Sequence, residues 1–290
     1  MLKYRFGLQV TLIALLCHAG TLSAAGISGI DLQYINDSNP AKAEFDRDIE
    51  AVGSVRGRIS VDLFSKELTN TDFVSSGISL GGVASYEHNL DISALGESQY
   101  RISLGGFHEN KRRRGLPFYR YSLSLGYVDS ETQIRDSTAL GLSVSVNHEL
   151  APFFDTTVGL LVEKREAETE VFDTIKTQLF ATANFSPVAR FVLRAGLRYV
   201  IGDEVSTATP TLEIVNTAAV IESDPAFGGV DANRFAYLID ANSVVVETGF
   251  GYEMSNLIET NLLYRFISTD ADGDISYERS LLELTLSLNF

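Results

Sequence analysis

Cysteine is almost absent from this chain, because its 290 residues contain only one, Cys17. Cys17 lies inside an apolar segment near the N-terminus, so the rest of the chain can form neither a disulfide nor a thiolate metal site. A Pro- or Ser-rich linker is missing as well, which favours one domain over two. The stability of that domain must therefore come from hydrogen bonding and packing.

Positive charge is also scarce. The chain has 23 basic and 38 acidic residues, a formal net charge of −15. A protein that binds phosphate backbones needs a basic footprint. This composition therefore argues against nucleic acid as a partner.

The first 25 residues have the layout of a secretory signal peptide. Lys3 and Arg5 precede an apolar run at residues 8–17, and small residues follow at 23–25. The run is too short for a membrane-spanning helix, which needs about 20 residues, whereas the order basic, apolar, small is typical of an export signal. We predict that residues 1–25 are removed and that residues 26–290 form the mature domain.

Long amphipathic helices are also lacking, and apolar residues instead alternate with polar ones in segment after segment. Leu140, Leu142 and Val144, for example, alternate with Gly141 and Ser143, the period-two pattern of a β-strand. Twelve such segments are predicted, at residues 27–35, 49–63, 72–86, 98–107, 117–128, 138–148, 153–163, 172–185, 189–202, 236–253, 257–268 and 277–290.

The lengths of these segments and of their connections indicate a membrane barrel. Each segment is long enough to cross a bilayer when tilted, whereas strands of soluble proteins commonly have about five or six residues. The connections after the sixth, eighth and tenth segments are short, and those after the first, seventh, ninth and eleventh are longer and rich in charge. Short turns at one end and long loops at the other are typical of outer-membrane barrels. We predict an all-β fold, a closed antiparallel transmembrane β-barrel of about 12 strands, with a soluble β-sandwich as the alternative.

The C-terminal segment "LLELTLSLNF" has leucines at alternate positions and ends in Phe290. It resembles the β-signal of bacterial outer-membrane proteins, on the positions Leu284, Leu286, Leu288 and Phe290. The resemblance covers the mature chain in pattern but only this strand in motif, so it indicates the superfamily and no particular member. It implies the outer membrane of a Gram-negative-type envelope, contact with membrane lipid and lipopolysaccharide, and the barrel-assembly machinery as a transient partner. We expect this strand to pair with the first, around Leu32.

The polar faces of the predicted strands carry charges of both signs. The predicted lumen-lining residues are Arg56, Arg58, Arg101, Arg120, Lys176, Arg190, Arg194, Arg198, Glu247, Glu259, Arg265 and Glu283. Arginines inside a barrel can favour the passage of anions, or facing carboxylates can neutralise them so that the side chains fill the lumen. Eight strands leave a filled interior and sixteen leave a channel. Twelve strands allow either outcome.

The connection Asp203–Phe235 is long enough to be functional. It could fold into the mouth as a constriction or extend the neighbouring strands above the membrane, and we expect the extension.

The sequence "STDADGDIS" places Asp270, Asp272 and Asp274 at alternate positions around a glycine. These residues are a candidate calcium site, although an Asp-Gly hairpin turn explains them without a metal. No other cofactor is expected.

Two further patterns bear on function. "KRRRG" at 111–115 would bind lipopolysaccharide phosphates on the outer side, but the strand order places it at the end with the short turns. Some outer-membrane barrels are lipid-modifying enzymes, and Asn36 and Asp37 resemble the polar pair of lipid A deacylases. His88, His108 and His148 are scattered, without a serine-nucleophile motif. The leading hypothesis is a porin-like channel for small polar solutes, with a closed surface-interaction barrel and a lipid-modifying enzyme as alternatives.

Overall fold

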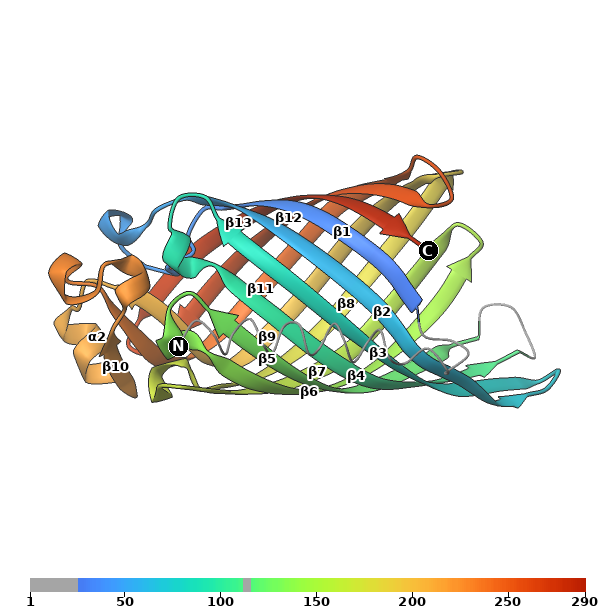
Figure 1. Ribbon diagram of the computed structural model, residues 1–290, viewed down its shortest axis with the longest axis horizontal. Helices are drawn as coiled ribbons and strands as arrows, with labels where there is room; N and C mark the ends of the chain where they lie inside the picture. The colour runs from blue at the N-terminus through green and yellow to red at the C-terminus, as the bar shows by residue number, and fades with distance from the viewer. Residues whose placement is uncertain (1–25, 112–115) are drawn as a thin grey trace.

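The computed structural model describes residues 26–111 and 116–290. The predicted signal peptide and most of the basic cluster at 111–115 lie outside the described residues. The described chain forms a closed barrel of twelve antiparallel strands (Figure 1). These strands are β1 (Gly26–Asp37), β2 (Val52–Asn70), β3 (Val74–Asn89), β4 (Glu97–Asn110), β5 (Phe118–Ser130), β6 (Ser137–Ala151), β7 (Phe154–Ala167), β8 (Thr174–Val188), β9 (Phe191–Ala208), β11 (Phe235–Glu253), β12 (Ile258–Ala271) and β13 (Ile275–Asn289).

Each predicted segment overlaps one of these strands, so the predicted fold class is confirmed. Neighbours in sequence pair with each other, β9 pairs with β11, and β13 pairs with β1. Each of these twelve strands therefore has a partner on both sides. This closure satisfies the backbone N–H and C=O groups, as the interior of a bilayer requires.

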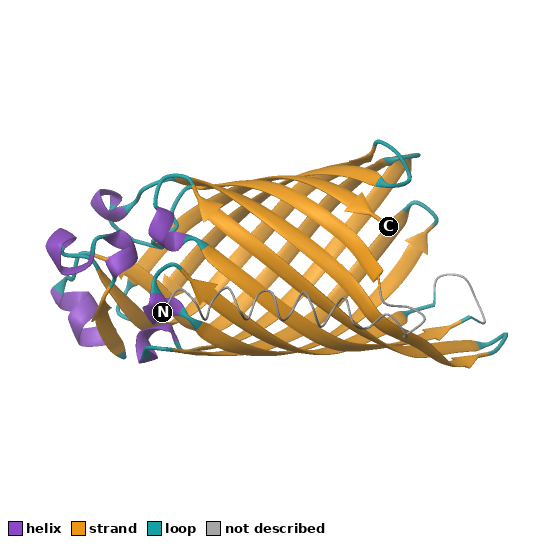
Figure 2. Cartoon of the chain, viewed as in Figure 1, coloured by secondary structure: helices purple, strands orange, loops and turns teal. Residues whose placement is uncertain are grey.

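The two ends of the barrel differ (Figure 2). At one end, which we call the turn end, the connections are short, and the chain passes from β8 to β9 through residues 189–190. At the other, the loop end, the connections carry all the helices described in residues 26–111 and 116–290. These are the 3₁₀ helices η1 (Asp46–Asp48), η2 (Ser93–Leu95), η3 (Gln133–Arg135), η4 (Glu170–Phe172), η5 (Pro225–Phe227) and η6 (Gly229–Ala232), and α2 (Leu212–Thr217). Within these residues, no helix is long and apolar enough to cross a membrane.

The outer face of the barrel is apolar because period-two alternation sends every second side chain outward. On β5, Leu123 and Leu125 are 48% and 62% exposed, and Leu140 and Leu142 continue the same surface on β6. So many exposed leucines would be unfavourable in water, but they suit lipid. The outer face is therefore the one that meets the hydrocarbon.

The seam between the first and the last strand follows the prediction. Ile30 pairs with Leu288, Leu32 with Leu286, and Tyr34 with Leu284, so the seam joins two apolar outward faces. Phe290 follows the last strand and is 71% exposed. Recognition of this strand by an assembly machinery stays a prediction.

Candidate functional site

The inner wall of the barrel is the candidate site, and pairing register decides which residues line it. Eleven of the twelve predicted residues occupy strand positions opposite in parity to the exposed leucines. They are Arg56 and Arg58 on β2, Arg101 on β4, Arg120 on β5, Lys176 on β8, Arg194 and Arg198 on β9, Glu247 on β11, Glu259 and Arg265 on β12, and Glu283 on β13.

Arg190 is an exception, and its prediction as a wall residue was wrong. Strand β8 ends at Val188 and β9 begins at Phe191, so Arg190 lies in the turn between them. Its φ is 69°, in the left-handed region that tight turns use. Extending the alternation by one residue had placed Arg190 in the strand.

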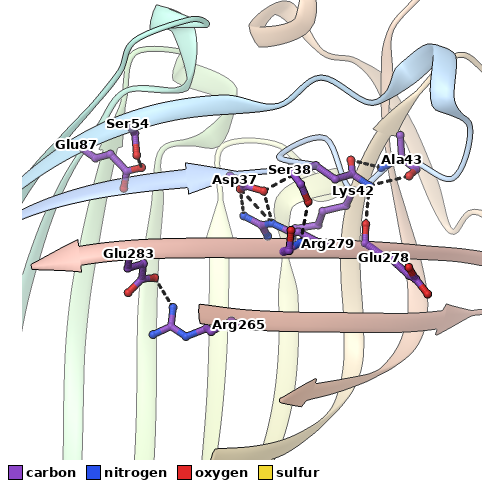
Figure 3. A network of polar contacts seen from close by, with 12 residues as sticks. Asp37, Ser38, Lys42, Ala43, Ser54, Glu87, Arg265, Glu278, Arg279 and Glu283 are labelled. Carbon is purple, nitrogen blue, oxygen red and sulfur yellow. Dashed lines mark hydrogen bonds and ion pairs between the residues drawn. The ribbon is translucent and has the colours of Figure 1, made fainter. Parts of the chain in front are cut away.

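A chain of ion pairs crosses four strands on one side of the wall. Arg198 lies 2.9 Å from Glu247, Glu247 lies 2.7 Å from Arg265, and Arg265 also pairs with Glu283 (Figure 3). Register produces this arrangement, because Glu247 on β11 lies opposite Arg265 on β12 and opposite Gly196 on β9. The Glu247 side chain is only 7% exposed. Its burial is tolerable because two guanidinium groups compensate its charge.

Other ion pairs reach across glycines. Arg101 on β4 lies 3.0 Å from Glu163 on β7, although β5 and β6 lie between them. The side chains extend over Gly126 and Gly141, where an added Cβ would lie 3.7 Å from Arg101 Nε and 3.9 Å from Glu163 Oε2. This pair therefore lies along the wall.

Arg194 on β9 also forms an ion pair that reaches across a glycine, on another part of the wall. It lies 2.9 Å from Glu259 on β12, across Gly251 of β11. The Arg194 side chain remains 41% exposed although it belongs to the inner wall. Solvent therefore reaches this part of the interior.

The remaining predicted wall cations mostly have carboxylate partners too. Arg56 bonds Glu87, and Arg58 lies 3.9 Å from Asp31. Lys176 lies 2.9 Å from Glu204, near the loop end. Facing carboxylates therefore neutralise most of the predicted wall cations, which is one of the two arrangements that the sequence allows.

Access to the interior changes along the barrel axis. On β6, the inward residues Ser137 and Ala139 near the loop end are 3% and 5% exposed. Ser143 and Ser145 on the same face, nearer the turn end, are half-buried. The inner wall is thus accessible toward the turn end and covered toward the loop end.

The cover is a cap built around residues 209–234, the middle of the long connection predicted from sequence. The ends of this connection belong to strands β9 and β11, and the short strand β10 (Val220–Ser223) pairs with the first residues of β11. This arrangement agrees with the predicted extension of the strands. The segment then crosses the mouth, since η5 contacts η2. Helix η2 belongs to the β3–β4 connection, half-way around the barrel from β9 and β11. The structure therefore combines both alternatives, extended strands and a covered mouth.

An apolar cluster fixes the inner side of the cap. Ile214 of α2 packs with Ile239 of β11 and Ile275 of β13, and the β1–β2 connection contributes Ala41 and Ala43 to the same cluster. Ile239 and Ile275 occupy inward-facing positions at the loop end of their strands. The cap thus closes onto the upper wall of the lumen.

Two buried carboxylates tie the cap to its surroundings. Asp224, which is fully buried, lies 2.5 Å from Arg135 of η3 and accepts a 2.6 Å hydrogen bond from the Thr207 hydroxyl. Asp48 of η1 pairs with Arg234 and accepts 2.9 Å hydrogen bonds from Thr209. These contacts join the cap to the connections on either side.

The β1–β2 connection enters the mouth through a separate polar network (Figure 3). Asp37 on β1 accepts hydrogen bonds from Arg279 on β13, and Asn39 donates a 2.8 Å hydrogen bond to the carbonyl of Ala43. Lys42, in this connection, pairs with Glu204. Burial is the largest influence on the Lys42 ammonium, and it lowers its pKa from 10.5 to about 8.

The candidate calcium residues do not converge. Asp270 is in β12 and points outward, whereas Asp272 and Asp274 lie in the turn that leads to β13. Gly273 and Asp274 have φ values of 77° and 56°, as a tight hairpin requires. Across residues 26–111 and 116–290, no group of three or more His, Cys, Asp or Glu residues could hold a metal ion.

The residues considered for lipid chemistry are also dispersed. Asn36 and Asp37 are consecutive in β1, so they point to opposite faces, and Asp37 is engaged by Arg279. His88 is exposed at the loop end of β3, and His108 is exposed near the turn end of β4. His148 lies near the turn end of β6. These positions do not assemble an acid–base site.

Comparison with known proteins identifies the fold. No family model matches the sequence, and no curated protein matches it. An outer membrane channel from Pseudomonas putida F1 superposes with a TM-score of 0.54 and 11% identity, covering 91% of this chain and 96% of that one. The chain has the fold of an outer-membrane β-barrel.

Two further solved barrels are less similar. The NanC porin matches with a TM-score of 0.46 and 7% identity over 90% of this chain and all of its own. The CymD monoaromatic hydrocarbon channel matches with a TM-score of 0.43 and 10% identity, covering 94% of this chain and 90% of that one.

Proposed function

We propose that this protein is an outer-membrane channel for small polar solutes, in which the cap at the loop end controls passage. The observation that carries the proposal is the solvent-accessible, charged inner wall, exemplified by the 41% exposed Arg194 side chain inside a closed barrel. The fold resemblance to an outer membrane channel from Pseudomonas putida F1 supports it.

The manner of ion pairing favours a passage over a filled interior. Arg101–Glu163 and Arg194–Glu259 lie over glycines, so these long side chains run along the wall. Charges of both signs along a narrow path can bind polar solutes weakly at several places, as conduction requires. The physiological partners in this proposal are small polar solutes, membrane lipid and lipopolysaccharide.

Planar-bilayer recording tests the channel directly. We expect the mature protein to give small conductance steps, and a variant with residues 210–233 replaced by a short Gly-Ser linker to give larger ones, because the cap covers the mouth. Heat-modified migration on gels would verify that both proteins are folded. Folded protein that gives no steps with or without the cap would overturn the proposal.

A closed surface-interaction barrel is the second candidate, and the complete burial of Asp224 within the cap favours it. A cap this firmly packed could seal the mouth and present its loops to outside partners. This alternative predicts that removal of residues 210–233 abolishes partner binding, whereas the channel proposal predicts a gain in conductance.

A further inference from the structure

Arg120 differs from the other predicted cations on the strands of the wall. It is exposed on the inner face of β5, near the turn end. No ion pair or hydrogen bond joins Arg120 to another residue in the described parts of the chain, although its guanidinium carbon lies 4.7 Å from the centroid of the Phe118 ring. Arg58, Arg101, Arg194, Arg198 and Arg265 all have carboxylate partners. Arg120 thus keeps its five donors available.

Arg120 belongs to a cavity of about 460 Å³ in the accessible half of the interior. This volume is in the range of sites that hold small ligands. Register places its lining residues on neighbouring strands, with Ser145 of β6 opposite Arg120 and Phe107 of β4 opposite it on the other side. The cavity is therefore part of the inner wall and open to a solute in the lumen.

Hydroxyl groups make up the polar remainder of the cavity. Ser65, Ser79, Ser122, Ser143 and Ser145 contribute to its lining from β2, β3, β5 and β6. None of the five hydroxyls has a hydrogen-bond partner in the part of the chain that the structure describes. A hydroxyl can donate and accept, so these serines suit a ligand that itself carries hydroxyl groups.

Two phenylalanines supply an apolar side. The rings of Phe107 and Phe118 are stacked, with centroids 5.7 Å apart and an interplanar angle of 18°, and both rings line the cavity. Glu109, the carboxylate next along β4, is opposite Phe118 in the register and forms no ion pair with Arg120 in the described chain. One face of a ligand can therefore rest on carbon while its charged end meets the guanidinium.

We propose that this cavity is a binding site for a small hydroxylated monocarboxylate. The Arg120 fork matches the two oxygens of a carboxylate, the serines bond the hydroxyl groups, and the phenylalanine pair contacts the carbon skeleton. The inference deepens the proposed channel function by naming its solute class, and it rests on that function for its physiological meaning.

Titration calorimetry of the refolded mature protein in detergent, with sodium gluconate as the probe and sorbitol as its uncharged counterpart, tests the site. We expect gluconate to bind more tightly than sorbitol, Arg120→Gln to weaken gluconate binding by roughly tenfold or more, and Arg120→Lys to weaken it less. Arg165→Gln is the matched control, because Arg165 is a half-buried inward arginine on β7 that lies outside this cavity. The affinity of the Arg165→Gln variant for gluconate should stay within about twofold of that of the unmodified protein, a change of less than 0.5 kcal/mol.

Three results would overturn the site: no gluconate binding, equal binding of sorbitol, or equal losses in Arg120→Gln and Arg165→Gln. Bilayer recording on the same preparations separates this inference from the channel proposal. Conductance without gluconate binding removes the site and leaves the channel, whereas gluconate binding without conductance removes the channel and leaves the site.

Discussion

The substitution Glu247→Gln tests whether burial decides the energetic value of a wall ion pair. Glu247 pairs with both Arg198 and Arg265, and its side chain is 7% exposed. The substitution removes its charge but keeps its shape, so Arg198 loses its partner while Arg265 keeps Glu283. Breaking a fully buried pair costs about 3–5 kcal/mol. The two arginines are 33% and 27% exposed, so water compensates them in part, and we expect about 2 kcal/mol.

Glu163→Gln is the matched control, because it makes the same chemical change in a more exposed pair. The side chains of Arg101 and Glu163 are 43% and 28% exposed, and a pair of this kind contributes about 0.5 kcal/mol or less. Equilibrium urea unfolding in lipid vesicles, followed by circular dichroism because the chain lacks tryptophan, measures both. A loss for Glu163→Gln equal to or larger than that for Glu247→Gln would refute the reasoning.

Three further outcomes are expected. Arg135→Ala leaves the buried Asp224 without its cation and should loosen the cap, giving faster protease cleavage at the loop end and larger conductance, whereas unchanged cleavage would contradict the role of this pair. Gly141→Val should destabilise the barrel by about 1–3 kcal/mol in the same urea assay, because an added Cβ lies only 2.6 Å from the Ser124 hydroxyl. The pKa of Lys42 is about 8 in the folded protein, against 10.5 for a free lysine, so the contribution of Lys42 to the free energy of unfolding rises between these two pH values. This rise should be absent in Lys42→Met. Identical pH profiles of unfolding for the two proteins would rule out the effect.

The barrel was predictable because its strands follow one rule throughout. Side chains alternate between lipid and lumen, so Leu140 and Leu142 together with Ser143 reveal strand β6 without any knowledge of its partners. The same alternation located Arg194 and Glu247 on the inner wall. It failed at Arg190, because a turn residue with positive φ follows no alternation.

The cap and the cavity were beyond sequence reasoning for a different reason. Residues 209–234 lack a period, and their path depends on contacts with Arg135 and η2 from distant connections. The cavity combines serines of four strands with Arg120, and their grouping follows from the stagger of the strands around the barrel. The sequence alone does not give the register of the strands, so it does not show which residues line the cavity together.

The position of the Asp37–Arg279 contact has a consequence for the order in which the molecule is made. These residues are 242 positions apart and belong to the two strands that close the cylinder. The contact that holds the β1–β2 connection in the mouth can therefore form only after the final strand has been synthesised and docked. Until then, β1 has an unpaired edge, and the β1–β2 connection lacks one of the contacts that hold it in the mouth. A chain truncated before β13 would consequently lose the organisation of its mouth together with its wall.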